Sequence, residues 1–267
     1  MSLFEQELYF ANLRATRIGM PLNIADTLES TNQFLLELAT QKAQEGTLAV
    51  AETQTAGRGR QRRLWHSPPG LNLYFSLLLW PDASLLRRPQ LAMLTALALR
   101  RAILTQDATL AIGLKWPNDL WINGLKISGI LCECPPEPLD GRYGIVIGIG
   151  LNINSLAEDF PQELHATATS LRIQAGGKLF SRERLLAEFC NAFQPLYDKW
   201  LKSADLLPFL PEWNEHDILI EKTIAVQRPN DIVTGMVTGY TPEGLLRLKT
   251  QDGVITISAG DAHLKRN

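Results

Sequence analysis

Four arginines stand within six residues of one glycine-containing segment of this sequence. They are Arg58, Arg60, Arg62 and Arg63. Glycine lets a backbone turn tightly and approach a ligand closely, and each arginine carries a fixed positive charge with a fork of donors. The segment therefore predicts a loop that wraps an anion, with a plain solvated turn as the alternative that the same local composition allows.

The positive charge of this segment is local. The whole chain of 267 residues has 26 Lys and Arg against 28 Asp and Glu, a formal net charge of −2. A surface that binds nucleic acid needs a broader basic footprint than one loop. We therefore expect the loop to hold one small phosphate-bearing molecule, and we expect no nucleic acid partner.

The pattern of apolar residues indicates the elements that position this loop. Strand-like runs at 47–51 and 71–79 flank it, so the loop is expected to hang from a sheet. Ser30, with Gln33 three residues later, predicts a helix N-terminus with a capping box. The helical spacing then continues to an expected stop at Gly46.

A β-hairpin at Asn123-Gly124 is the strongest short turn signal in the chain. A later strand, 143–151, has Gly148 and Gly150 at alternate positions, which leaves one face bare for a ligand ring or another backbone. The other expected elements are a long buried helix at 90–104, a helix at 181–202 capped by Ser181, and strands at 110–116, 120–122, 126–131, 218–226, 232–240, 245–249 and 254–258, with turns at Pro229-Asn230-Asp231, Pro242-Glu243-Gly244 and Asp252-Gly253.

Composition indicates a globular protein, and the pattern of short strands near its end indicates a small all-β tail. Hydrophobic residues make up 45% and charged residues 20% of the chain, which are ordinary globular values. The run of short strands over about the last 50 residues predicts a separate small β-barrel. No apolar run approaches the roughly 18 residues of a membrane span, and no signal peptide is evident, so we expect no membrane partner and a cytoplasmic location.

The cysteines and histidines do not form a metal-binding pattern. Cys132, Cys134 and Cys190 lack further ligands at the spacing of a metal site, so we interpret all three as reduced packing residues. The four histidines are scattered along the chain, and none has an acid/base or metal partner close in sequence.

Four motifs, taken in order, resemble those of the biotin protein ligases. Each motif is weak alone, but the ordered set is specific, extends over nearly the whole chain, and is followed by a β-rich tail similar to the family's C-terminal domain. The motifs are Glu29-Ser30-Thr31-Asn32, Gln54 with Gly57-Arg58-Gly59-Arg60, Lys115-Trp116-Pro117-Asn118-Asp119 with Lys126 seven positions later, and Gly148-Ile149-Gly150-Leu151-Asn152-Ile153-Asn154.

The resemblance implies a fold, a reaction and partners. The fold is a catalytic domain over 1–217, a mixed sheet with helices like that of class II aminoacyl-tRNA synthetases, and an SH3-like barrel over 218–267. The reaction joins biotin and ATP, with Mg²⁺, into biotinyl-5′-adenylate, and then acylates a lysine of a biotin carboxyl carrier domain. The resemblance leaves a monomer and a homodimer both open.

The resemblance also implies roles for individual residues. Lys126, between the biotin carboxyl and the α-phosphate, and Arg60, in the loop that closes over the ligand, would be catalytic; cations there would neutralise charge that develops at the phosphate. The set expected to bind biotin is Ser30, Thr31, Asn32, Gln54, Gly57, Arg58, Gly59, Arg60, Lys126 and Gly129; the set for ATP is Arg60, Arg63, Trp65, Asn118 and Asn152; and the expected Mg²⁺ ligand is Asp119.

The sequence departs from the family pattern in two places, and two rival functions are weighed. Many bacterial members carry an N-terminal helix-turn-helix domain, for which the motif at Ser30 leaves no room, so no repressor function is expected. Gln61 stands where several members have Arg or Gly. The rivals are a lipoate ligase or octanoyltransferase of the same fold and a non-catalytic binding protein; the arginine loop argues against the first, and Lys126 with Asp119 against the second.

Overall fold

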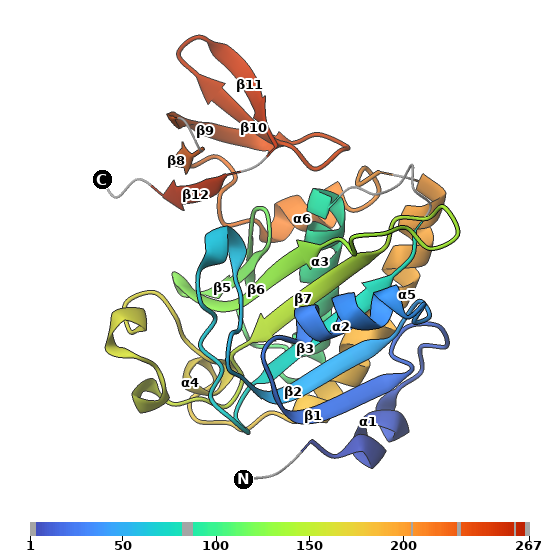
Figure 1. The fold of residues 1–267 in the computed structure, drawn as a ribbon. Coiled ribbons are helices and arrows are strands. Elements are labelled where there is room, and N and C mark those ends of the chain that lie inside the picture. Colours follow the sequence, from blue (N-terminus) through green and yellow to red (C-terminus); the bar gives the residue numbers. More distant parts are fainter. Residues whose placement is uncertain (1–3, 82–87, 204, 229–230, 259, 265–267) are drawn as a thin grey trace.

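The computed structural model describes residues 4–81, 88–203, 205–228, 231–258 and 260–264. Figure 1 shows a larger α/β part and, at the top, a smaller sheet formed by the end of the chain. The elements are α1 (Gln6–Asn12), β1 (Leu22–Leu28), α2 (Thr31–Thr40), β2 (Leu48–Gln54), β3 (Leu73–Leu79), α3 (Arg88–Gln106), β4 (Gly113–Lys115), β5 (Asp119–Ile122), β6 (Leu125–Glu133), β7 (Ile145–Leu151), α4 (Leu171–Gln174), α5 (Arg182–Ser203), α6 (Leu210–His216), β8 (Thr223–Gln227), β9 (Ile232–Tyr240), β10 (Leu246–Thr250), β11 (Gly253–Ile257) and β12 (Asp261–Leu264).

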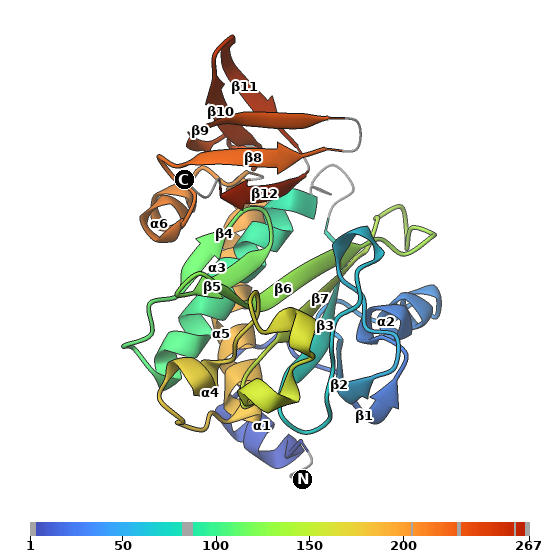
Figure 2. The same ribbon diagram turned by 90° about the vertical axis from the view of Figure 1, so that its left-hand side faces the viewer.

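The larger part is built on a mixed seven-stranded sheet, which confirms the predicted fold class. Its strand order is β1-β2-β3-β7-β6-β5-β4. The pair β1–β2 is parallel and every other neighbouring pair is antiparallel. In Figures 1 and 2, α2 covers one face of this sheet, and α3 and α5 cover the other.

The alternation of side chains along β3 assigns each face its role. Phe75 and Leu77 belong to the main apolar core with α3 and α5, whereas Leu78 packs in a smaller apolar cluster with α2. Ser76, which is fully buried, points to the α2 face and hydrogen-bonds to that helix. The α2 face therefore carries polar groups in the middle of the sheet, where a ligand can reach them.

Two hairpins bring β5, β6 and β7 into register. Asn123 and Gly124 have φ values of 50° and 79°, as the predicted tight turn between β5 and β6 requires. Asp140 and Gly141 do the same between β6 and β7, with φ values of 50° and 77°. As a result, Gly129 of β6 lies opposite Gly150 of β7.

The start and end of α2 differ from the sequence-based expectation. Ser30 is the N-cap residue, but its side chain makes no capping hydrogen bond, and Gln33 bonds to Glu37 instead of completing a capping box. The helix ends at Thr40 rather than near Gly46. Gly46 is needed for a different reason, because a Cβ there would lie 1.8 Å from the carbonyl oxygen of Arg17.

Several elements had no recognisable pattern in the sequence. β1 is a half-exposed edge strand without apolar alternation, and α1 and α4 span only 7 and 4 residues. The strand expected at 110–116 is confined to Gly113–Lys115. β8 begins at Thr223, later than expected, and β12 was missed. Of the turn expected at Pro229-Asn230-Asp231, the first two residues lie outside the described residues.

The smaller sheet is antiparallel, has the order β11-β10-β9-β8-β12, and packs directly on the larger part. Trp116 Nε1 donates to the carbonyl oxygen of Gly244, 3.0 Å away, and Trp213 meets Tyr240 edge to face. Residues of both parts belong to one continuous apolar core. Figure 2 shows the smaller sheet lying above β4, α3 and α6.

Membrane-spanning helices are not found among the described residues, since none of their helices is both long enough and apolar enough to cross a bilayer.

Candidate active site

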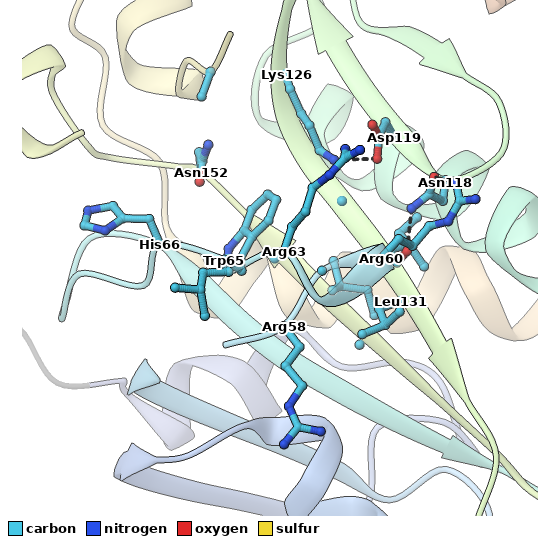
Figure 3. Close-up of a pocket in the computed structure, with 18 of the residues that line it drawn as sticks. Arg58, Arg60, Arg63, Trp65, His66, Asn118, Asp119, Lys126, Leu131 and Asn152 are labelled. Carbon is cyan, nitrogen blue, oxygen red and sulfur yellow. Dashed lines mark hydrogen bonds and ion pairs between the residues drawn. The ribbon is translucent and has the colours of Figure 1, made fainter. Parts of the chain in front are cut away.

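A cavity of about 440 Å³ opens on the α2 face of the large sheet. Its walls come from the N-terminus of α2, the arginine loop, the β4–β5 corner and the segment after β7, with Ala262 of the smaller sheet at the rim (Figure 3). Of the residues predicted for the site, the cavity is lined by Ser30, Thr31, Asn32, Gln54, Arg58, Gly59, Arg60, Arg63, Trp65, Asn118, Asp119, Lys126, Gly129 and Asn152.

Gly57 is the one predicted binding residue that does not line the cavity. Its carbonyl oxygen accepts a hydrogen bond from the backbone N–H of Trp65, at 2.9 Å. A Cβ at position 57 would lie 2.8 Å from the Trp65 carbonyl oxygen. Gly57 therefore lets the two ends of the arginine loop approach each other, and the loop geometry depends on it.

Glycines on β6 and β7 make the floor of the cavity. A Cβ on Gly148 would lie 2.2 Å from Asn32 Oδ1, and one on Gly150 would lie 2.3 Å from the Trp65 ring. The glycines were expected to leave this face to a ligand ring or another backbone; in the structure the side chains of Asn32 and Trp65 lie against them instead. Any larger residue would lift them off the sheet.

Polar groups gather at the end of the cavity formed by α2 and β2. Gln54 Oε1 accepts the backbone N–H of Thr31 at 2.9 Å, and Gln54 Nε2 lies 3.2 Å from Ser67 Oγ. Asn32 and Ser76 are buried beside them and hydrogen-bonded to each other. The groups at this end can form hydrogen bonds with the donors and acceptors of a small polar ring.

An ammonium–carboxylate pair lies at the centre of the cavity wall. Lys126 Nζ is 2.7 Å from Asp119 Oδ1, and it also lies 5.5 Å from the centre of the Trp65 ring. Figure 3 shows Lys126 and Asp119 pointing toward one another. The main chain of Lys126 is held in turn by hydrogen bonds with Thr167 and Thr169. The sequence motif thus brings together two groups that stand seven residues apart.

The arginine loop reaches across the cavity to other parts of the molecule. Arg60 Nη1 donates to Asn118 Oδ1 and Arg60 Nη2 to the carbonyl oxygen of Gly260, both at 3.1 Å. Arg58, by contrast, is exposed and points away from this group (Figure 3). The two arginines of one loop therefore have different surroundings, and Arg60 alone of this pair connects the loop to the smaller sheet.

Trp65 and Asn152 flank the opposite end of the cavity. Trp65 Nε1 is buried and has no hydrogen-bond partner among the described residues. Asn152 is held by Nδ2, which donates to the carbonyl oxygen of Thr169 at 3.0 Å. An indole face, a donor without a partner and a fixed amide suit a flat heteroaromatic ring.

Buried polar groups support the floor from below. The carboxylate of Glu52 on β2 holds Arg182 through two contacts of 2.6 and 3.1 Å. Asn72 accepts the backbone N–H of Ile153 at 2.7 Å and donates to Tyr74 Oη at 3.0 Å. Burial raises the pKa of Tyr74 well above its ordinary value, so its phenol stays protonated at neutral pH.

The sequence-based prediction missed the residues that follow Asn154 in the segment after β7, and several supporting groups. His66 of the arginine loop contacts the carbonyl oxygen of Asp159 at 2.8 Å, which ties the two segments together. The short 3₁₀ turns of this segment have no apolar period, so nothing in the sequence indicated them. The lining residues that were missed include Lys115, Trp121, Leu131, Phe160, Leu164, Thr167, Ala168 and Ala262.

The comparisons with known proteins agree with this geometry. The biotin/lipoate A/B protein ligase family model matches residues 24–152, and the biotin protein ligase C-terminal domain model matches residues 219–265. The bifunctional ligase/repressor BirA of Bacillus subtilis is 37% identical over 98% of this chain and 79% of that protein. The biotin–[acetyl-CoA-carboxylase] ligase of Paracoccus denitrificans is 29% identical over 87% of this chain and 96% of that protein.

A solved structure shows the same similarity. The biotin protein ligase from Aquifex aeolicus, in complex with biotin and ATP, has a TM-score of 0.79 and 28% sequence identity, and the match covers 93% of this chain and 100% of that one. Family models, relatives and fold thus agree over both parts of the molecule. The chain belongs to the biotin/lipoate A/B protein ligase family and, within it, to the biotin protein ligases.

Proposed function

We propose that this chain is a biotin–[acetyl-CoA-carboxylase] ligase. It activates biotin with ATP to biotinyl-5′-adenylate and transfers the biotinyl group to a lysine of a carrier domain. The observation that carries the proposal is one cavity whose lining combines polar groups at Thr31 and Gln54, the indole and amide of Trp65 and Asn152, and the ammonium of Lys126, 5.5 Å from the centre of the Trp65 ring. Such a cavity can hold both halves of an acyl-adenylate at once.

The first step joins two anions, so the site must supply positive charge. The biotin carboxylate attacks the α-phosphorus of ATP, a carbon–oxygen–phosphorus anhydride forms, and pyrophosphate leaves. Lys126 is positioned to neutralise the approach of the carboxylate and the charge on the phosphate. Arg60 and Arg63 add fixed charge along the same wall. Because the guanidinium of arginine does not lose its proton, this charge is present throughout turnover.

Asp119 and Asn118 suit a Mg²⁺ ion that arrives with the nucleotide. Mg²⁺ retains several waters and is commonly bound by one or two carboxylates together with substrate phosphates. Among the described residues no cluster of three or more His, Cys, Asp or Glu could hold a metal alone. We therefore propose that Asp119 holds Mg²⁺ only together with ATP phosphates, where the ion would neutralise phosphate charge.

The second step transfers biotin to a carrier lysine. The lysine amine attacks the acyl carbon of the adenylate, an amide forms, AMP leaves and the amine loses a proton. Until then the anhydride must be kept from water, which a closed loop achieves. Contacts of Arg60 with Asn118 and Gly260 support this role for the arginine loop. We further propose that residues 218–267 act as a C-terminal domain that completes the rim of the site.

Pyrophosphate exchange with different acids tests the proposed function. Biotin, lipoate and octanoate are offered in turn with ATP and labelled pyrophosphate. We expect exchange with biotin alone, because the polar end of the cavity has groups that a dithiolane or an alkyl chain would leave unpaired. Exchange with lipoate or octanoate would support the rival activity, and binding of biotin without exchange would indicate a non-catalytic protein.

A further inference from the structure

Neighbours of the Asn32 amide fix its orientation. Asn32 is only 4% exposed. Its Nδ2 lies 2.7 Å from Glu133 Oε2 and 3.3 Å from the carbonyl oxygen of Leu131, and its Oδ1 lies 2.6 Å from Ser76 Oγ. Carboxylate and carbonyl oxygens only accept hydrogen bonds. The amino group must therefore face Glu133, and the amide oxygen must face Ser76.

This orientation determines where the hydroxyl protons lie. An amide oxygen carries no proton, so the 2.6 Å contact requires Ser76 to donate to Asn32 Oδ1. Ser76 Oγ also lies 2.7 Å from Thr31 Oγ1. Because Ser76 has already used its single proton, the Thr31 hydroxyl completes this second contact as the donor. Gln54 Oε1 also lies 3.2 Å from Thr31 Oγ1, but it accepts a shorter bond from the backbone N–H of Thr31, at 2.9 Å, which leaves the Thr31 hydroxyl proton for the 2.7 Å contact with Ser76.

We propose that Glu133 is a positioning residue that polarises this chain of hydrogen bonds in one direction. Protons point from Thr31 to Ser76, from Ser76 to Asn32, and from Asn32 to Glu133. The Thr31 oxygen, which lines the cavity, then presents only lone pairs to a ligand. Glu133 itself is not among the lining residues and acts through Asn32. The inference rests on the proposed function, and it assigns the Thr31 acceptor to a ureido N–H of biotin.

This chain of hydrogen bonds also explains how the site discriminates biotin from other carboxylic acids. A buried acceptor that finds no donor on its ligand loses binding energy, so a site built for an N–H rejects analogues that lack one. Lipoate and octanoate have no N–H group. Gly148 contributes to the same selectivity, because a Cβ there would lie 2.2 Å from Asn32 Oδ1 and displace the amide from the chain.

The test compares biotin with its cyclic carbamate analogues, in which one ureido N–H is replaced by oxygen. Affinities are measured by calorimetry for the wild type and Glu133→Gln, because glutamine can face Asn32 with either end of its amide. We expect Glu133→Gln to weaken biotin about tenfold, the size of one hydrogen bond. The same substitution should weaken binding of the analogue that lacks the N–H facing Thr31 by about twofold or less, because that analogue already lacks the hydrogen bond to Thr31.

Glu137→Gln is the matched control, because it makes the same change of charge on the exposed connection between β6 and β7. It should leave all affinities unchanged. If Glu133→Gln weakened binding of biotin and of both analogues equally, the proposal would be overturned. A purely structural effect would lower all three affinities alike, whether or not the ligand carries the N–H. Unchanged biotin affinity in that variant would overturn it as well.

A charge exchange provides a second, independent test. Asn32→Asp places two carboxylates together and should weaken biotin more than Glu133→Gln does. In the double variant Asn32→Asp with Glu133→Gln, the new carboxylate accepts from both Ser76 and the new glutamine amide, so the repulsion is relieved while the direction at Ser76 and Thr31 is kept. We expect the double variant to bind biotin more tightly than Asn32→Asp alone. A double variant that binds biotin as weakly as Asn32→Asp, or more weakly, would contradict the proposed direction of these hydrogen bonds.

Failure of this inference can be told apart from failure of the proposed function. If the wild-type protein shows no biotin-dependent pyrophosphate exchange, the function is wrong. If the wild type exchanges normally but Glu133→Gln keeps its full preference for biotin over the analogues, the function stands and the one-way chain is wrong.

Discussion

Lys126 and Asp119 show how much a single residue's role depends on what surrounds it. A lysine on a hairpin strand is usually a solvated charge, and the sequence offered only its distance from the Asn118-Asp119 corner as evidence for more. The β5–β6 hairpin converts that distance into a contact of 2.7 Å between Lys126 Nζ and Asp119 Oδ1. The same ammonium therefore has a carboxylate partner before any ligand arrives, which the sequence could not indicate.

At this scale the first prediction concerns Lys126→Ala. The variant should lose biotin-dependent pyrophosphate exchange by on the order of 10²-fold or more, the effect of removing one charged group from a transition state. Its unfolding temperature should stay close to that of the wild type, because the side chain is 29% exposed and does not belong to the apolar core. Exchange at the wild-type rate would contradict a catalytic role.

Lys178→Ala is the control for that experiment. Its ammonium also pairs with a carboxylate, Asp107, at 2.9 Å, but it lies outside the cavity. Removing it deletes a comparable ion pair without changing the charge near the phosphates, so exchange should be unaffected. Loss of activity in both variants would indicate a general effect of charge.

Among the elements, the arginine loop is the one whose internal structure the sequence described least well. Its glycines and arginines predicted a turn that binds an anion, yet Arg58 points away from Lys126 and Asp119, whereas Arg60 donates a hydrogen bond to Asn118. Gln61, at a φ of 55°, reverses the chain just after Arg60. Which side of a loop each arginine takes is decided by such backbone angles, and these carry no pattern in composition.

Arg60→Gly tests whether this loop retains the adenylate. The change removes the contacts to Asn118 and Gly260 and adds backbone freedom, so we expect faster release of biotin and of the adenylate with a smaller effect on its formation. Released adenylate should then label lysines of a bystander protein. The measurement is bystander biotinylation at matched turnover, together with the adenylate dissociation rate.

Arg58→Gly is the matched comparison within the same loop. It removes the same charge and adds the same backbone freedom, but its side chain points away from the Lys126–Asp119 pair. We expect much less bystander labelling than with Arg60→Gly. Wild-type labelling and dissociation in Arg60→Gly would mean that the guanidinium contacts do not hold the loop closed.

For the whole molecule, the sequence predicted the main strands and helices better than it predicted the contacts that complete the cavity. Strands 47–51, 71–79 and 143–151 and the two long helices were predictable because each has a strong apolar period or run. The contacts of the smaller sheet with the site were not: Ala262 lines the cavity and Gly260 accepts a hydrogen bond from Arg60 through tertiary packing alone. Likewise Ser76 and Glu133 resemble any strand residues until their contacts with Asn32 are known.

Asp217, at the junction of the two parts, should make stability depend on pH. Burial raises its pKa, partly opposed by hydrogen bonds from Tyr240, Leu219 and Trp213. A carboxyl with a raised folded pKa binds its proton more tightly when folded, so its contribution to stability falls as pH rises from about 4 through the folded value. Asp217→Asn should therefore cost less stability at pH 7 than at pH 4, measured by denaturant unfolding.

Asp107 provides a control of opposite sign in the same measurements. Hydrogen bonds from Thr109, then from Lys178, lower its pKa to about 2. Its contribution to stability is present above the unfolded pKa and is lost as pH falls toward 2, so Asp107→Asn should cost more at pH 7 than at about pH 3. The same direction of change in both variants would contradict the assignment for Asp217.

The last prediction concerns a chain cut after Asp217. The sequence predicts a separate small barrel, which could be removed without loss of stability, but Trp116 and Trp213, 2% and 1% exposed, pack against the smaller sheet, so the fragment should be less stable than the full chain. Uncovering an apolar side chain costs about 1.5–3 kcal/mol, so the fragment should unfold at a clearly lower temperature. Its polar end at Thr31 and Gln54 stays complete, and biotin should still bind. The KM for ATP should rise, because Arg60 loses its contact with Gly260 and the cavity loses Ala262. An unfolding temperature and an ATP KM equal to those of the full chain would show that the smaller sheet supports neither the core nor the site.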